Sequence, residues 1–162
     1  MTTRLPSNMS LHYFIIPILI FLVAYGGSSF TSGGMDWYKS INLPTWVPPG
    51  SVIGLVWTTI FILSAISLIT FWNRAPHDKY FWIVIGVCVI NGLLNIAWSY
   101  LFFGIHYLGW AVIEAALLDL SVVALIVMMW PTSQLSALLL VPYAGWVAFA
   151  TYLTYVVYSL NH

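Results

Sequence analysis

Three groups of residues recur at helical spacing, and each contains a tryptophan. Residues three or four apart in an α-helix lie on one face. A tryptophan on such a face can stack its indole ring on a flat ligand and donate its N–H to an acceptor. The groups are Gly54, Trp57, Phe61 and Ser64; Asn91, Asn95, Trp98 and Phe102; and Tyr143, Trp146, Ala150 and Thr154.

These three stripes allow two interpretations. Small residues such as Gly54 and Ala150 let neighbouring helices approach closely, so the stripes fit ordinary helix contacts. They equally fit a cavity for a flat apolar ligand, which Asn95 and the indole N–H groups would orient. The stripes alone leave both interpretations open.

Two acidic residues, Glu114 and Asp119, lie within an apolar segment. Their five-residue spacing separates them by about 140° around a helix, which argues against a carboxylate pair for acid–base catalysis. An acid inside a membrane segment is costly and is by default a functional candidate. Glu114 is therefore predicted either to bond an indole or amide of another helix or to contact a ligand or a translocated proton.

The histidine positions argue against a metal or haem centre. His12, His77, His106 and His162 are expected near helix ends or in loops, whereas a bundle haem takes its ligands from inside facing helices. The single cysteine, Cys88, cannot form an intrachain disulfide. Glycine-rich phosphate loops, H-E-x-x-H and G-x-S-x-G do not occur, so standard hydrolytic chemistry is not predicted.

The composition is that of a protein dissolved in lipid. Of the 162 residues, 62% are apolar and 5% are charged, and the mean hydropathy is +0.97. Soluble domains are about 25% charged, so this chain cannot cover a water-facing surface. The formal net charge is zero, which excludes nucleic acid as a partner because phosphate binding needs a basic surface. The sequence predicts an integral membrane protein.

Five segments are long and apolar enough to cross a hydrocarbon core about 30 Å thick. None alternates with the period of two that a barrel strand requires. The predicted fold is therefore all-α: one domain, residues 1–162, forming a bundle of five transmembrane helices. The first segment is expected to be retained, because no convincing A-x-A cleavage site follows Ala24. The segments are about residues 11–24 or slightly beyond, 52–72, 81–103, 108–130 and 135–158.

The connections between these segments differ in length. Three are short, near residues 74–79, 104–108 and 131–134, and predict that helices two to five are sequential antiparallel neighbours. The first connection, residues 26–49, is far longer than a turn needs, as is typical of a functional lid. We expect it to fold over one end of the bundle, because it carries the apolar residues Trp37, Tyr38, Ile41, Leu43 and Trp46.

Basic residues give the orientation. Arg4, Arg74 and Lys79 fall on one predicted side of the membrane, and Lys39 falls on the other. Cytoplasmic segments carry an excess of Lys and Arg, so three basic residues on one side against one on the other favour an N-terminus in the cytoplasm and a C-terminus outside.

Three motifs resemble the translocator protein and tryptophan-rich sensory protein family, also called peripheral benzodiazepine receptors. In the family's order and spacing, they cover most of the chain, from about Trp37 to Leu153. They are Trp37-Tyr38-x5-Pro44-x-Trp46-x-Pro48-Pro49 followed by Val56-Trp57-Thr58; Asn95-x-x-Trp98-x-x-x-Phe102-Phe103-Gly104 continuing to Gly109-Trp110-Ala111-x-x-Glu114; and Pro142-Tyr143-x-x-Trp146-x-x-Phe149-Ala150-x-x-Leu153.

The resemblance implies five membrane helices around a pocket that the first loop closes, in a homodimer. It implies binding of porphyrins such as protoporphyrin IX, of sterols in animal members, and of synthetic isoquinoline carboxamides and benzodiazepines. The ligand-binding residues implied by position are Tyr38, Trp46, Trp57, Phe61, Asn95, Trp98, Phe102, Glu114, Trp146 and Ala150.

The sequence departs from the family pattern at three places. Phe61 stands where many members have Tyr, and Thr154 replaces a usual Asn. Residues 153–162 contain no Lys or Arg, whereas the animal sterol motif ends in a basic residue, so sterol binding is not expected here. The short tail is what we expect of a bacterial member in the cytoplasmic membrane.

Three functions remain open from the sequence. The first is a receptor for tetrapyrroles, with protoporphyrin IX as a ligand and not a permanent cofactor, and with Lys39 or loop N–H groups meeting its propionates. The second follows from the resemblance: light- and oxygen-dependent porphyrin degradation, for which Trp57 and Trp146 would be the catalytic residues. The third is transport of porphyrin or sterol-like molecules. Glu114 is the only residue that would support this function, by coupling transport to the movement of protons.

Overall fold

The computed structural model describes residues 11–162, and this part of the chain contains helices and no strands. Five helical spans are long and apolar enough to cross a membrane, which confirms the predicted all-α, five-span integral membrane protein. Arg4, which entered the orientation argument, lies outside the described residues. The elements are α1 (His12–Gly33), α2 (Met35–Ser40), α3 (Gly50–Arg74), α4 (Lys79–Ser99), the π-helix η1 (Tyr100–Gly104), α5 (Leu108–Met129) and α6 (Gln134–Leu160).

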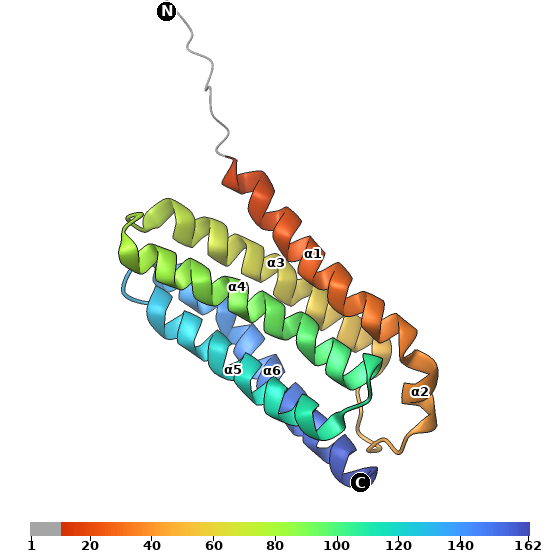
Figure 1. Ribbon diagram of the computed structural model, residues 1–162. Coiled ribbons are helices and arrows are strands. Elements are labelled where there is room, and N and C mark those ends of the chain that lie inside the picture. The colour runs from red at the N-terminus through yellow and green to blue at the C-terminus, as the bar shows by residue number, and fades with distance from the viewer. Residues whose placement is uncertain (1–10) are drawn as a thin grey trace, which may run out of the picture.

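The long helices form a closed ring in the order α1, α3, α6, α5 and α4, and α4 packs back on α1 (Figure 1). The expectation that α3 and α4 are packed neighbours is therefore wrong. Their contacts gather at the linked ends, where Phe71 stacks on Phe81 with ring centroids 5.7 Å apart, and α1 packs against both helices. A short loop fixes the distance between two helix ends, but it does not fix packing along their length.

The first span is longer than the sequence predicted. Helix α1 continues to Gly33, so the long connection shortens to residues 34–49. A Cβ at Gly26 would lie 3.2 Å from Ile96 Cδ1, and a Cβ at Gly27 would lie 3.2 Å from Ser99 Oγ. The two glycines thus let α1 approach α4 closely, and this packing offsets their poor helix propensity.

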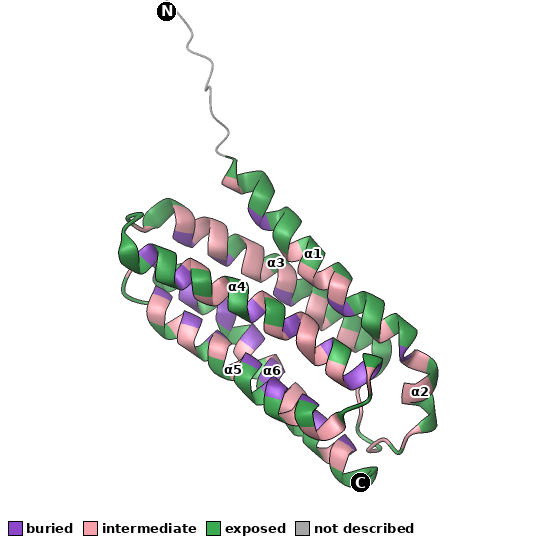
Figure 2. Ribbon diagram, viewed as in Figure 1, coloured by how far each residue is buried: buried purple, intermediate pink, exposed green. Residues whose placement is uncertain are grey.

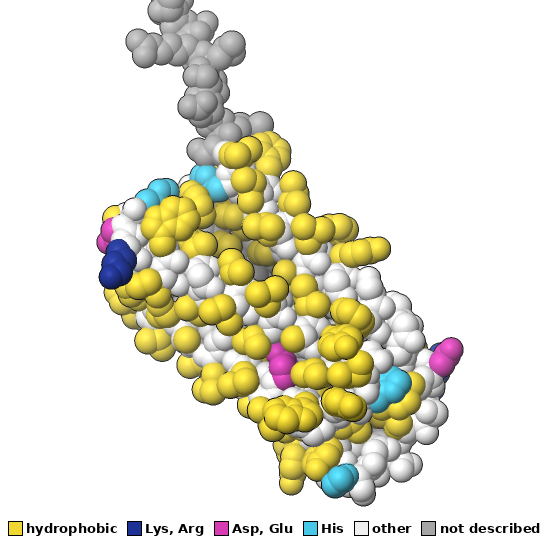
Figure 3. Space-filling model, in the orientation of Figure 1, with side chains coloured by type: hydrophobic (Ala, Val, Ile, Leu, Met, Phe, Trp, Pro, Cys, Tyr) yellow, Lys and Arg dark blue, Asp and Glu magenta, His cyan; other side chains and the backbone are white. Residues whose placement is uncertain are grey.

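Buried residues lie on the inward sides of the helices and exposed residues on the outward sides (Figure 2). The main core joins α3, α4, α5 and α6, whereas α1 buries only Ile16 and Gly27. Large hydrophobic side chains are exposed on every long helix and cover most of the face in Figure 3. Such an exterior suits hydrocarbon, where only a fully hydrogen-bonded backbone is tolerated.

A π-helix ends the third span. The amide of Ile105 donates to the carbonyl of Tyr100 at 2.9 Å, a bond to the fifth preceding residue. Single π-turns are rare and frequently occur at functional sites. Here the wider turn brings both Phe102 and Phe103 into the interior, where they are 3% and 9% exposed.

Candidate ligand-binding cavity

A cavity of about 710 Å³ lies within the ring, lined by α1, α3, α4, η1, α5 and α6 and by the connection from α1 to α3. Its size falls in the range of about 300–1,000 Å³ that is usual for small-molecule and cofactor sites. Most of its lining side chains are aliphatic or aromatic, with a few polar groups among them. A ligand that fits it must therefore be largely apolar.

The three sequence stripes converge on this cavity. Trp57 stacks with Phe61 at 5.6 Å, and Trp98 stacks with Phe102 at 5.2 Å. Of the stripe residues, Ser64, Asn91 and Tyr143 are absent from the lining. The convergence of three helices on one space favours the cavity interpretation over simple helix contacts. The stripe residues in the lining are Gly54, Trp57, Phe61, Asn95, Trp98, Phe102, Trp146, Ala150 and Thr154.

Two tryptophans of the lining have free indole donors. Nε1 of Trp98 and Nε1 of Trp146 are buried, and neither has a hydrogen-bond partner among the described residues. Leaving a buried donor unpaired costs about 1–3 kcal/mol. Both donors lie in the wall of one cavity with almost no accessible surface, so a bound molecule reaches them only if the rings move.

A hydrogen-bonded chain holds Asn95 in place. Asn95 Nδ2 donates to the Tyr143 hydroxyl at 3.1 Å, and that hydroxyl donates to Asn91 Oδ1 at 3.2 Å. Asn91 Nδ2 then donates to Ser121 Oγ at 2.8 Å. The chain joins α4, α5 and α6, so the amide at the cavity wall is fixed from behind by three helices.

Helix α2 covers one end of the cavity. The Trp37 ring lies on the His106 ring with centroids 3.9 Å apart, and it meets the Phe102 ring edge-on at 5.7 Å. Tyr38 packs against Phe103 at 5.5 Å. A Cβ at Gly34 would overlap the carbonyl oxygen of Phe103, so only glycine fits at the start of this segment.

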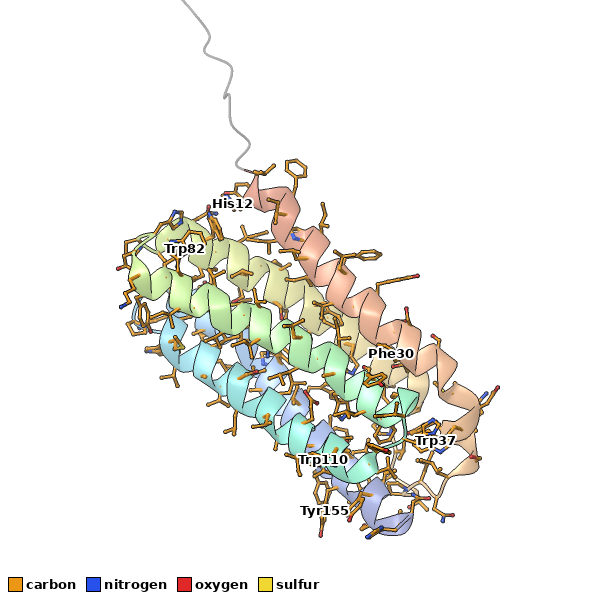
Figure 4. All side chains as sticks on the ribbon, viewed as in Figure 1. His12, Phe30, Trp37, Trp82, Trp110 and Tyr155 are labelled. Atoms are coloured by element: carbon orange, nitrogen blue, oxygen red, sulfur yellow. The ribbon has the colours of Figure 1, made fainter. Side chains whose placement is uncertain are left out.

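The rest of the connection is tied to the end of α6. The amide of Asn42 donates to Asn161 Oδ1 at 2.9 Å, and Asn161 Nδ2 donates to the Asn42 carbonyl at 2.8 Å. Figure 4 shows Trp37 at the end of the molecule opposite His12 and Trp82. Burial raises the pKa of the hydroxyl of Tyr38, which lines the cavity. We call residues 34–49 the lid.

Eight of the ten predicted site residues line the cavity, and Trp46 and Glu114 do not. Trp46, an apolar residue of the connection that we expected to fold over the bundle, is 45% exposed and stacks on Tyr152 at 5.8 Å. The amide of Val47 bonds the carbonyl of Pro44 in a tight turn. At this turn Trp46 lies outside the lining, against α6, while Val47 contributes to it.

Glu114 is buried, at 7% exposure, on α5. Neither carboxyl oxygen has a hydrogen-bond partner among the described residues, so the expected bond to an indole or amide is not seen. Its neighbour Ala115 and, one turn along α5, Leu118 reach the cavity instead.

Sequence reasoning missed the contribution of α1. Six of its residues line the cavity: Phe21, Ala24, Tyr25, Gly27, Ser28 and Thr31. The small or polar members among them recur at helical spacing, and this is the signal that could have indicated an inward face. The cavity has an open side, because Phe21 and Tyr25 of α1 and Gly54 and Thr58 of α3 are exposed.

Comparisons with known proteins identify the family of the chain. The chain is 34% identical over 149 residues to the tryptophan-rich protein TspO of Bacillus cereus, covering 89% of this chain and 95% of that protein. It is 34% identical to the translocator protein of Homo sapiens, covering 87% of this chain and 85% of that protein. Protein CrtK of Rhodobacter capsulatus is also 34% identical, with 83% of each chain covered. The TspO/MBR family model matches residues 15–159, and with five spans around an aromatic cavity the chain belongs to the TspO/MBR family.

Proposed function

We propose that this protein is a membrane receptor for tetrapyrroles of the protoporphyrin IX type. One observation carries the proposal: the cavity within the bundle is lined by three tryptophans that come from three different helices. Their aromatic faces suit a flat apolar ring.

The aromatic side chains of the cavity would contribute to the affinity for a porphyrin ring by stacking. Stacking of a flat heterocycle on an aromatic side chain contributes about 1–3 kcal/mol. Two or three such contacts from Trp57, Trp98 and Trp146 would supply a substantial part of the roughly 8 kcal/mol that micromolar binding requires. The fixed amide of Asn95 would limit the orientations of the ring, because its nitrogen is already held by Tyr143.

The family resemblance supports two further parts of the proposal. We propose that the protein acts as a homodimer and that it does so in a bacterial cytoplasmic membrane. Cross-linking in membranes, followed by electrophoresis under denaturing conditions, tests the dimer directly.

Light-dependent degradation of the bound ring is a second candidate function. It is favoured by the position of Trp57 and Trp146, since both line the cavity and would lie beside a bound ring. The porphyrin would supply the photochemistry with oxygen as the oxidant, and the protein would supply position and redox-active indoles. Transport through Glu114 has less support, because this residue does not line the cavity.

The proposal is tested by titrating the purified protein with protoporphyrin IX in the dark and following tryptophan fluorescence. Saturable micromolar quenching is expected, and it should weaken in Trp57→Phe and Trp146→Phe. Trp110→Phe is the matched control, because Trp110 is 64% exposed and lies outside the cavity. Absence of saturable quenching would overturn the assignment.

Illumination of the loaded protein in air separates receptor from enzyme. Loss of the porphyrin absorbance at the rate of a detergent control supports a receptor. Faster loss that depends on Trp57 or Trp146 supports degradation.

A further inference from the structure

One side chain of the cavity lining is formally charged at neutral pH. That residue is Lys39, and the lining contains no Asp, Glu, His or Arg. Lys39 is therefore the one formally charged side chain that a ligand in this cavity meets among the described residues.

Lys39 lies at the lid end of the cavity. It belongs to the last turn of α2, directly after Tyr38, and its side chain is exposed. The other basic residues that the structure describes, Arg74 and Lys79, lie at the linked ends of α3 and α4. Figures 1 and 4 place that connection at the opposite end of the bundle from α2. At its lid end, which we call the mouth because Lys39 is exposed there, the lining thus carries one ammonium group, and the rest of the lining is uncharged.

We propose that Lys39 binds a carboxylate of the ligand at this mouth, so that the cavity selects flat apolar molecules carrying an anionic group at one edge. This inference rests on the proposed function and adds the orientation of the ligand. A carboxylate deep in the cavity would lose its hydration without gaining a countercharge. At the mouth it keeps contact with water and gains a charge-assisted hydrogen bond.

Three amides of the lid backbone already have partners, so they are less available to the carboxylate than the exposed Lys39. The amide of Tyr38 already donates to the Gly34 carbonyl, that of Asn42 to Asn161, and that of Val47 to Pro44. Asp36 lies one turn before Lys39 on α2, so its carboxylate competes for the ammonium group. Removing the carboxylate of Asp36 should therefore strengthen binding of the anionic ligand, whereas removing the ammonium group of Lys39 should weaken it.

The experiment compares protoporphyrin IX, which has two propionates, with its neutral dimethyl ester, in an uncharged detergent. Lys39→Met should weaken binding of the acid about three- to fivefold, as for an exposed ion pair, and leave the ester within about twofold. Lys39→Arg keeps the positive charge, so it should retain the wild-type preference for the acid over the ester. Asp36→Asn should tighten binding of the acid and leave binding of the ester unchanged. Lys79→Met, at the other end, should change neither ligand.

Each contrary result has a distinct meaning. Equal affinity of the wild-type protein for acid and ester would overturn the role of Lys39 while leaving the receptor intact. Equal losses for both ligands in Lys39→Met would also overturn it, because the lysine would then act through its apolar stem. Failure of both ligands to saturate the wild-type protein would instead refute the proposed function.

Discussion

The indole ring of Trp37 lies almost parallel to the imidazole ring of His106, with centroids 3.9 Å apart and planes 14° apart. His106 has a φ of 60°, in the left-handed region that residues other than glycine seldom adopt. It follows the π-helix η1 directly after Ile105, where the chain turns toward α5. An unusual backbone conformation at the end of one span thus presents the surface on which the lid rests.

Replacing Trp37 with alanine should loosen the lid. The change removes aromatic contacts to both Phe102 and His106, each worth about 0.5–1.5 kcal/mol beyond burial. We expect faster porphyrin release by stopped-flow fluorescence and faster amide exchange within residues 34–49. Trp110→Ala serves as control, since Trp110 is exposed on α5. Unchanged release and exchange would show that other contacts hold the lid.

Trp98→Phe and Trp146→Phe should separate binding from stability. Each change removes a buried N–H that has no partner among the described residues, so the empty protein should be as stable as the parent or slightly more stable. Ligand affinity should fall about three- to tenfold if the lost donor served an acceptor. Thermal unfolding in detergent and dark titration measure the two effects. A clear loss of stability in the empty protein would contradict the assignment of these donors to a ligand.

Gly54 and Gly34 should respond in opposite ways to a larger side chain. A Cβ at Gly54 meets no heavy atom within 4 Å, so Gly54→Ala should stabilise α3 by about 0.5–1 kcal/mol. Gly54→Leu should extend into the cavity and weaken porphyrin binding, because Gly54 is part of the lining.

Gly34→Ala is the contrasting variant. Its Cβ would overlap the Phe103 carbonyl, so the start of the lid must shift and the melting temperature should fall. If Gly54→Leu bound porphyrin normally, the ligand would have to occupy another part of the cavity.

Tyr143→Phe should destabilise the protein. The lost hydroxyl accepts from Asn95 and donates to Asn91, so both amides would be left without these partners in the interior. The expected cost is about 1–3 kcal/mol, measured as a lower melting temperature. Tyr155→Phe, on an exposed tyrosine of the same helix, should leave the melting temperature unchanged. Equal stability of the two variants would mean that the amides find other partners.

Helical spacing predicted the cavity wall well where a stripe contains residue types that lipid does not explain. Asn95 and Trp98 are costly in hydrocarbon, so their common face indicated the interior. On α1 the inward residues Phe21 and Ala24 look no different from those facing lipid, and the small or polar residues Gly27, Ser28 and Thr31 form a weaker signal than a buried Asn or Trp. The direction of Trp46 depends on one turn at Pro44, which composition cannot reveal.

The order of helices around the ring depended on tertiary packing. Loop length correctly placed α5 beside both α4 and α6, but it could not show that α1 packs against both α3 and α4. That arrangement depends on Gly26 and Gly27, which allow close approach to Ile96 and Ser99. Small residues at one face permit such contacts without specifying which helix makes them.

The ring order has a consequence for biosynthesis. Helix α6 joins α3 to α5 and carries Trp146, Ala150 and Thr154 of the lining, yet it leaves the ribosome after the four other spans. During translation the nascent chain is an open arc with no wall on that side. A premature stop codon anywhere before α6 should therefore leave a membrane-inserted fragment with no residual porphyrin affinity.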